Sequence, residues 1–279
     1  MHLKFNLICI KTYTMNSEDV KRFGIIIFES LPDEDIKTGY ELFSSTLTNK
    51  TYEEELLHIE YLDLENKDIF LNELLRIANE AIDNNYFYFL HFEIHGFNGG
   101  LILKNGEEIF WHELLPIFQM MNIHYLDTLV IYLAVCEGAS LLKEINPIER
   151  SPFGSIVASP HKIIEKDLAI GFEKFYDKFF FSFELKASLE EYNTVIKNEK
   201  SRLSLITSQY CINTLCNIER ETADKERLFK ILEDTFNKHD PNFKNLPESE
   251  VFEVLKKELY EIFEEFKLNK DFYLMNDLK

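Results

Sequence analysis

The sequence is poor in the two residues that most often mark linkers and turns. It contains only 9 glycines and 7 prolines in 279 residues, and it shows no internal repeat and no low-complexity stretch. Long flexible linkers and repeat architectures are therefore excluded. The length fits one large domain or two small ones.

Long apolar runs are also missing. The longest, Leu129 to Cys136, is far shorter than the roughly 18 residues that a membrane span requires. Near the start, the apolar stretch Phe5 to Ile10 is interrupted by Asn6 and is followed by no small-residue cleavage site, so it does not predict a signal peptide. We therefore expect a cytoplasmic protein that does not act at a membrane.

Cysteine and positive charge are both scarce. Four cysteines, Cys9, Cys136, Cys211 and Cys216, do not make a disulfide framework in a chain of this size, so reduced thiols are expected. Lys and Arg number 30 against 49 Asp and Glu, which gives a formal net charge of −19. A surface this acidic repels phosphate groups, which argues against nucleic acids and anionic membranes as partners.

The order of apolar segments predicts an α/β fold. Short β-branched or aromatic runs alternate with segments of helical spacing. The expected strands are at 24–28, 57–64, 86–94, 129–135 and 155–159, and the expected helices are near 33–43, 68–81, 111–121 and 171–183. Asn105-Gly106 predicts a hairpin between 101–103 and 107–110. This order is typical of a mostly parallel sheet sandwiched by helices.

For two of the expected helices, the sequence also predicts the start or the buried face. The acidic run Asp33 to Asp35 is expected to open the first helix, because negative charge favours a helix N-terminus. In the second helix, the residues expected to face the core are Ile69, Leu71, Leu74, Leu75 and Ile77.

Strand patterns stop near residue 190, and helices are expected at 188–217, 224–238 and 248–268. In the last of these, apolar residues recur every four positions from Val251 to Phe263. We therefore expect an N-terminal extension over residues 1–19, an α/β domain over 20–190 and an α-helical C-terminal region over 191–279.

Two reactive side chains follow neighbouring apolar strands. His95 comes directly before Gly96, and Cys136 comes two residues before Gly138. Because the carboxyl ends of parallel strands meet at one edge of a sheet, both side chains are expected at the same rim. A cysteine needs a nearby base to supply thiolate near neutral pH. The pair therefore predicts a Cys136 nucleophile with His95 as general acid and base.

Four segments around this pair occur in a distinctive order: FEIHG at 92–96, GLILKNGEEIFWHELL at 100–115, VIYLAVCEGA at 130–139 and GSIVAS at 154–159. In this order they resemble the caspase-like clan of cysteine proteases, and within it the bacterial CHAT-type (caspase HetF-associated with TPR) peptidases. The resemblance extends over roughly residues 20–190. It implies a caspase-like fold and an endopeptidase that acts through an acyl-enzyme, without metal or cofactor.

The resemblance also assigns roles to individual residues. Cys136 would be the nucleophile and His95 the general acid and base. The backbone N–H groups of Gly96 and Cys136 would form the oxyanion hole.

Substrate preference is expected to differ from that of caspases. Where caspases have Gln-Ala-Cys-Arg-Gly, this chain reads Ala-Val-Cys-Glu-Gly from Ala134 to Gly138. The first of these positions helps to form the P1 pocket in relatives, so Ala134 predicts a small or apolar P1 residue. Ser159 and His161, close to the end of the last predicted strand, are further candidates for contact with substrate.

The resemblance further implies a dedicated protein substrate, such as a pore-forming protein or a toxin, in regulated cell suicide or antiviral defence. A separate activator or sensor protein is expected, with the helical C-terminal region as a docking or regulatory module. The polar, proline-containing segment Lys143 to Phe153 is the expected place for an activation loop or a self-cleavage.

Two other interpretations stay open. A caspase-like domain without activity would serve as a scaffold that binds other proteins. Alternatively, His91, Glu93 and His95 alternate along one strand, face the same side and would form a zinc site with Cys136. We expect instead that His91 packs beneath the site and that Glu93 orients neighbouring groups, with no metal bound.

Overall fold

The computed structural model describes residues 22–51, 57–146, 149–217 and 270–279. The predicted N-terminal extension over 1–19 and the predicted helices at 224–238 and 248–268 lie outside these ranges.

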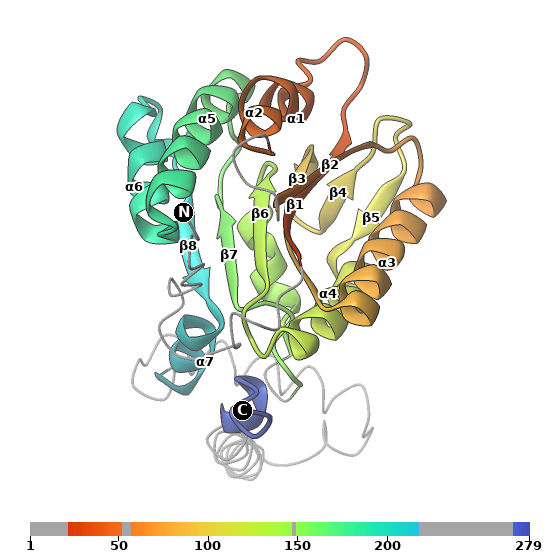
Figure 1. Cartoon of the computed structure of the whole chain (residues 1–279), viewed down its shortest axis with the longest axis vertical. Helices are drawn as coiled ribbons and strands as arrows, with labels where there is room; N and C mark the ends of the chain where they lie inside the picture. Colours follow the sequence, from red (N-terminus) through yellow and green to blue (C-terminus); the bar gives the residue numbers. More distant parts are fainter. Residues whose placement is uncertain (1–21, 52–56, 147–148, 218–269) are drawn as a thin grey trace, which may run out of the picture.

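The centre of the protein is a sheet in the order β2-β1-β3-β6-β7-β8 (Figure 1). The first five of these strands are parallel, and β8 is antiparallel to β7. The strands are β1 (Arg22–Ser30), β2 (Leu57–Asp63), β3 (Tyr86–Phe97), β6 (Val130–Ala134), β7 (Ser155–Ala158) and β8 (Ser204–Thr207). The predicted hairpin forms β4 (Gly100–Ile102) and β5 (Glu108–Phe110), and β4 pairs with the end of β3.

Helices cover both faces of the sheet (Figure 1). One layer contains α3 (Lys67–Asn84) and α4 (Trp111–His124), and the other contains α5 (Glu165–Ser182) and α6 (Leu185–Val195). The shorter elements are α1 (Thr38–Glu41), η1 (Leu42–Leu47), α2 (Thr48–Thr51), η2 (Gly138–Glu144), η3 (Glu199–Ser201) and α7 (Ser208–Asn217).

Alternation along β3 separates the two faces. The Phe92 ring lies 6.1 Å from that of Phe70 on α3 and 5.8 Å from that of Phe118 on α4. The neighbouring His91 points the other way, with its ring 4.5 Å from Phe172 on α5. Because the strand is buried on both faces, its apolar run is nearly continuous, as parallel sheets require. The predicted fold class, a mostly parallel sheet between helices, is confirmed.

The second predicted helix is present as α3, but its buried face differs from the prediction. Ile69 and Leu75 are 44% and 41% exposed, and Leu71 is only partly buried. The fully buried positions are Phe70, Leu74, Ile77, Ala78 and Ala81. They recur at helical spacing from Phe70, whose ring packs against those of two neighbouring sheet phenylalanines, so this aromatic side chain fixes the orientation of the helix.

The expectation that strands end near residue 190 is wrong. β8 extends the sheet beyond β7, and α6 runs across the expected boundary. β8 is only four residues long and lies at the sheet edge with partly exposed side chains, so it lacks the long apolar run that identifies the central strands. Up to residue 217, the described chain therefore continues the α/β domain.

Asp127, in the turn between α4 and β6, should make stability depend on pH. Its carboxylate accepts hydrogen bonds from Ser208 Oγ at 2.8 Å and Asn122 Nδ2 at 3.2 Å. Burial nevertheless raises its pKa from 3.8 to about 7. The folded protein therefore binds more protons than the unfolded chain between these two pH values, and this contribution to stability falls as the pH rises through that window.

Asp127→Asn is expected to remove the loss of stability that ionisation of the buried Asp127 carboxyl causes as the pH rises. Asparagine tolerates the positive φ of 67° at this position. The variant should gain stability over the wild type from pH 5 to pH 8, by roughly 1–2 kcal/mol once partial exposure is allowed for. Thermal unfolding across this pH range measures the gain. Asp83→Asn, on an exposed part of α3, is the control, and parallel curves for Asp127→Asn and wild type would contradict the prediction.

Candidate active site

The predicted catalytic residues belong to neighbouring segments of the sheet: His95 lies on β3, and Cys136 lies two residues after the end of β6. The parallel register of β3 and β6 runs as far as the Glu93–Ala134 pair, so His95 and Cys136 each come two residues after this last pair. The backbones also approach closely here. A Cβ built on Gly96 would overlap the carbonyl oxygen of Cys136 and would lie 3.1 Å from its amide nitrogen.

One detail of the prediction is corrected. His95 does not follow the end of its strand, because β3 continues to Phe97. Its last residues leave β6 and pair with the β4–β5 hairpin, with His95 opposite Ile102. The backbone of His95 is therefore held by the hairpin.

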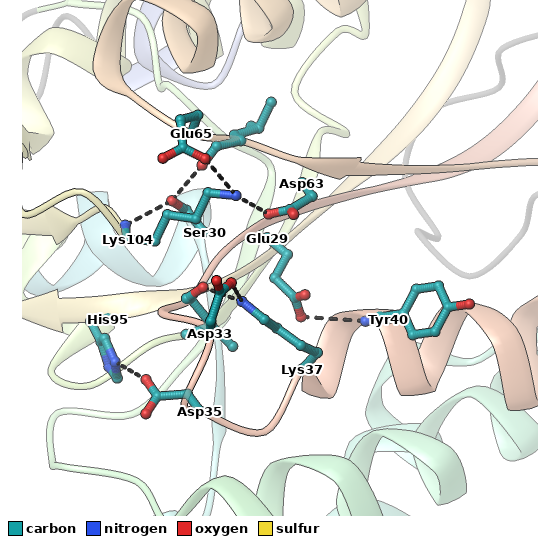
Figure 2. A network of polar contacts seen from close by, with 12 residues as sticks. Glu29, Ser30, Asp33, Asp35, Lys37, Tyr40, Asp63, Glu65, His95 and Lys104 are labelled. Carbon is teal, nitrogen blue, oxygen red and sulfur yellow. Dashed lines mark hydrogen bonds and ion pairs between the residues drawn. The ribbon is translucent and has the colours of Figure 1, made fainter.

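A third residue, Asp35, was missed by the sequence analysis. Its Oδ2 lies 2.6 Å from Nε2 of His95 (Figure 2). Asp35 belongs to the loop between β1 and α1. The expected helix start at Asp33 to Asp35 is wrong, because the helix begins only at Thr38. Functional groups gather at the carboxyl ends of parallel strands. This rule applies equally to the loop after β1, which contains Asp35.

The Asp35 carboxylate fixes the state of the imidazole. A carboxylate only accepts hydrogen bonds, so Nε2 of His95 carries the proton that is donated to Asp35. Nδ1 is then the nitrogen that can take a proton from another group. The His95 side chain is 42% exposed, which leaves it accessible from solvent.

Cys136 lies on a sharp turn after β6. The following residue, Glu137, has a positive φ of 57°, and its N–H donates to the His161 carbonyl at 2.9 Å. The N–H of Ile163 points at the Cys136 sulfur, with an N···Sγ distance of 3.4 Å. The partly exposed thiol thus sits between the end of β6 and the loop after β7, and a backbone N–H faces it.

The predicted oxyanion hole stays a prediction. Its two residues, Gly96 and Cys136, are adjacent in space.

The candidates for substrate contact differ in accessibility. His161 is exposed, and its carbonyl accepts from the turn after Cys136. Ala134 is 3% exposed, on the same sheet face as Cys136. Ser159 is fully buried, and its hydroxyl donates to Lys200 O at 3.0 Å while accepting from the His161 N–H. The Ser159 hydroxyl therefore helps to shape the loop, and its contact with substrate stays a prediction.

The zinc interpretation gains no support from the structure. His91 is fully buried, with Nε2 2.9 Å from Glu93 Oε1 and Nδ1 2.9 Å from the Tyr176 hydroxyl. His95 binds Asp35 instead of joining them. Across the described ranges, no three His, Cys, Asp or Glu side chains are grouped so that they could hold a metal ion. The expectation that His91 packs beneath the site is confirmed.

The predicted activation segment, Lys143 to Phe153, is attached to residues 270–279. Arg150 makes two hydrogen bonds to the Asp277 carboxylate, at 2.7 and 2.8 Å, and its guanidinium lies 4.1 Å from the centre of the Phe272 ring. The Ser151 N–H donates to Tyr273 O at 3.0 Å. Self-cleavage within this segment stays a prediction.

No family model and no curated protein sequence matches the chain. Among the helices in the described ranges, none combines the length and the apolar character needed to cross a membrane.

Proposed function

We propose that the protein is a cysteine endopeptidase of the caspase-like type, with Cys136 as nucleophile and His95 as general acid and base. The observation that supports this most is the hydrogen bond between His95 and Asp35, together with the close approach of the next residue, Gly96, to the Cys136 backbone. An imidazole held by a carboxylate next to a thiol is the arrangement that activates a cysteine.

The proposed reaction begins when the Cys136 thiol transfers its proton to His95 and the sulfur attacks the carbonyl carbon of a peptide bond. The imidazolium, stabilised by Asp35, gives the proton to the amine nitrogen as the C–N bond breaks. Water then attacks the thioester, His95 takes one of its protons, and release of the acid restores the thiol. No redox step or external cofactor is needed for this cycle.

The substrate side of the proposal rests on the resemblance and on Ala134. A small or apolar P1 residue would lie near this alanine, and the substrate would be a dedicated protein in bacterial defence or regulated cell death. A partner that releases the segment after Cys136 would act as the activator.

Thiol reactivity tests the proposal without a known substrate. At pH 7, a chloroacetamide probe should label Cys136 about 100-fold faster than Cys211, which is buried and whose pKa burial raises to about 11. His95→Ala should slow labelling of Cys136 by about tenfold or more. Mass spectrometry of the labelled peptides gives each rate.

The rate at which Cys136 is labelled has to be compared with that of an ordinary exposed thiol. An unstructured cysteine peptide supplies the rate of an ordinary exposed thiol, so exposure alone is accounted for. If Cys136 reacts no faster than this peptide and His95→Ala changes nothing, the inactive scaffold becomes the better interpretation.

A further inference from the structure

Two buried carboxylates lie side by side beneath the candidate site. Glu29 on β1 and Glu93 on β3 are register partners, and they are 0% and 2% exposed. Burial raises the pKa of Glu29, hydrogen bonds from Tyr61 and Gly39 lower it, and the charge of Glu93 raises it further. Burial of a carboxylate destabilises the fold unless the group accepts hydrogen bonds. The hydrogen-bond partners of Glu29 and Glu93 are therefore important for stability.

Most of those partners belong to the start of α1. Glu29 Oε2 accepts from the N–H of Gly39 at 2.7 Å and from that of Tyr40 at 3.3 Å, and the second bond is drawn in Figure 2. Glu93 Oε2 accepts from the Thr38 hydroxyl at 2.8 Å. The two carboxylates therefore fasten three consecutive residues that directly follow the loop of Asp35.

Gly39 shows how close this attachment is. A Cβ at this position would lie 2.8 Å from Glu29 Oε2 and 3.1 Å from Glu93 Cγ. Only a residue without a side chain lets the backbone approach both acids. The same loop is closed by Lys37, at its α1 end, whose ammonium donates to the carbonyl of Leu31 at its β1 end.

We propose that Glu29 and Glu93 are positioning residues that set Asp35 against His95 through the start of α1. Glu93 and His95 stand two residues apart on β3, so one rigid strand holds His95 directly and Asp35 through Thr38. This proposal rests on the proposed function, because Asp35 acts on the chemistry only through His95.

Thr38→Val is the sharpest test, because it removes the hydroxyl and keeps the shape of the side chain. In the full chain, Asp35→Ala should slow labelling of Cys136 about tenfold and Thr38→Val about threefold or more, while Thr38→Ser keeps the wild-type rate. The double variant Thr38→Val/Asp35→Ala should be no slower than Asp35→Ala. Glu29→Gln should slow labelling as Thr38→Val does.

A second readout follows His95 itself. Nitrogen-15 NMR of the imidazole reports which ring nitrogen carries the proton. The wild type should show the proton on Nε2, and both Asp35→Ala and Thr38→Val should show a mixture of the two forms. Asp63→Asn is the matched control, because Asp63 is the register partner of Glu29 on β2 but pairs with Lys104 instead of α1.

The outcomes separate the two proposals. If Asp35→Ala alters both readouts while Thr38→Val and Glu29→Gln alter neither, the positioning role is overturned and the proposed function stands. If wild-type Cys136 has only ordinary reactivity, the proposed function fails. The positioning role of Glu29 and Glu93 is then tested by the NMR result alone. A mixed imidazole form in Thr38→Val then still supports positioning, and an unchanged form overturns it.

Discussion

Cleavage of a mixed peptide library should be lost when Cys136 is replaced by alanine, with a fall of at least about a thousandfold. The substitution removes the only atom in the proposed site that can form the acyl-enzyme. Alanine loses the contact between the sulfur and the Ile163 N–H but keeps the backbone hydrogen bonds of the turn, such as Glu137 N–H to His161 O, so the fold should be retained. Sequencing of the library products measures the loss and gives the P1 preference of the wild type.

Cys211→Ala is the control for the loss of a thiol. Cys211 is a buried residue of α7, and its removal should leave cleavage intact. Cleavage that persists in Cys136→Ala would overturn the nucleophile assignment, and strict Asp or Arg at P1 would overturn the expected preference at Ala134. The wild type and Cys136→Ala should each be tested alone and together with the products of neighbouring genes, so that an activator is included.

The sequence was sufficient for the five parallel strands of the sheet and for the choice of His95 and Cys136 as candidates. The central strands are apolar on both faces, and this makes them visible as runs. His95 and Cys136 follow from similar reasoning, because both come just after the stretch over which the parallel strands β3 and β6 pair, although β3 itself continues to Phe97.

Asp35 could not be predicted in the same way. Its acidic neighbours and the apolar spacing from Ile36 to Phe43 fit a helix start. The structure instead begins the helix at Thr38, where the bonds to Glu29 and Glu93 hold the backbone. These bonds join residues far apart in the sequence, and a tertiary contact of this kind overrides local preference without leaving a periodic pattern.

Gly96→Ala should damage the site almost as much as loss of the nucleophile. A Cβ at Gly96 would overlap the carbonyl oxygen of Cys136 and would lie 3.1 Å from both its carbonyl carbon and its amide nitrogen. The obstacle is backbone, so it cannot rotate away as a side chain can. The two strand ends must separate instead, and a displacement near 1 Å between catalytic groups costs about 100-fold in rate.

Activity on the best library peptide should therefore fall at least about 100-fold in Gly96→Ala, and overpacking should lower the free energy of unfolding by about 1–3 kcal/mol. Gly99→Ala is the matched control. Three residues further on, its new Cβ would meet only the end of the Phe97 ring, at 2.9 Å, and this ring can move.

The rate of Cys136 labelling separates the two effects of Gly96→Ala. If the variant is destabilised but Cys136 still labels at the wild-type rate, the strand ends have separated without disturbing the thiol and His95, and Gly96 matters for packing alone. If activity and stability both match those of Gly99→Ala, the backbones of Gly96 and Cys136 are not in contact in solution. That result would remove the geometric basis for an oxyanion hole formed by these two residues, while the Cys136–His95 pair would have to be judged on its own reactivity.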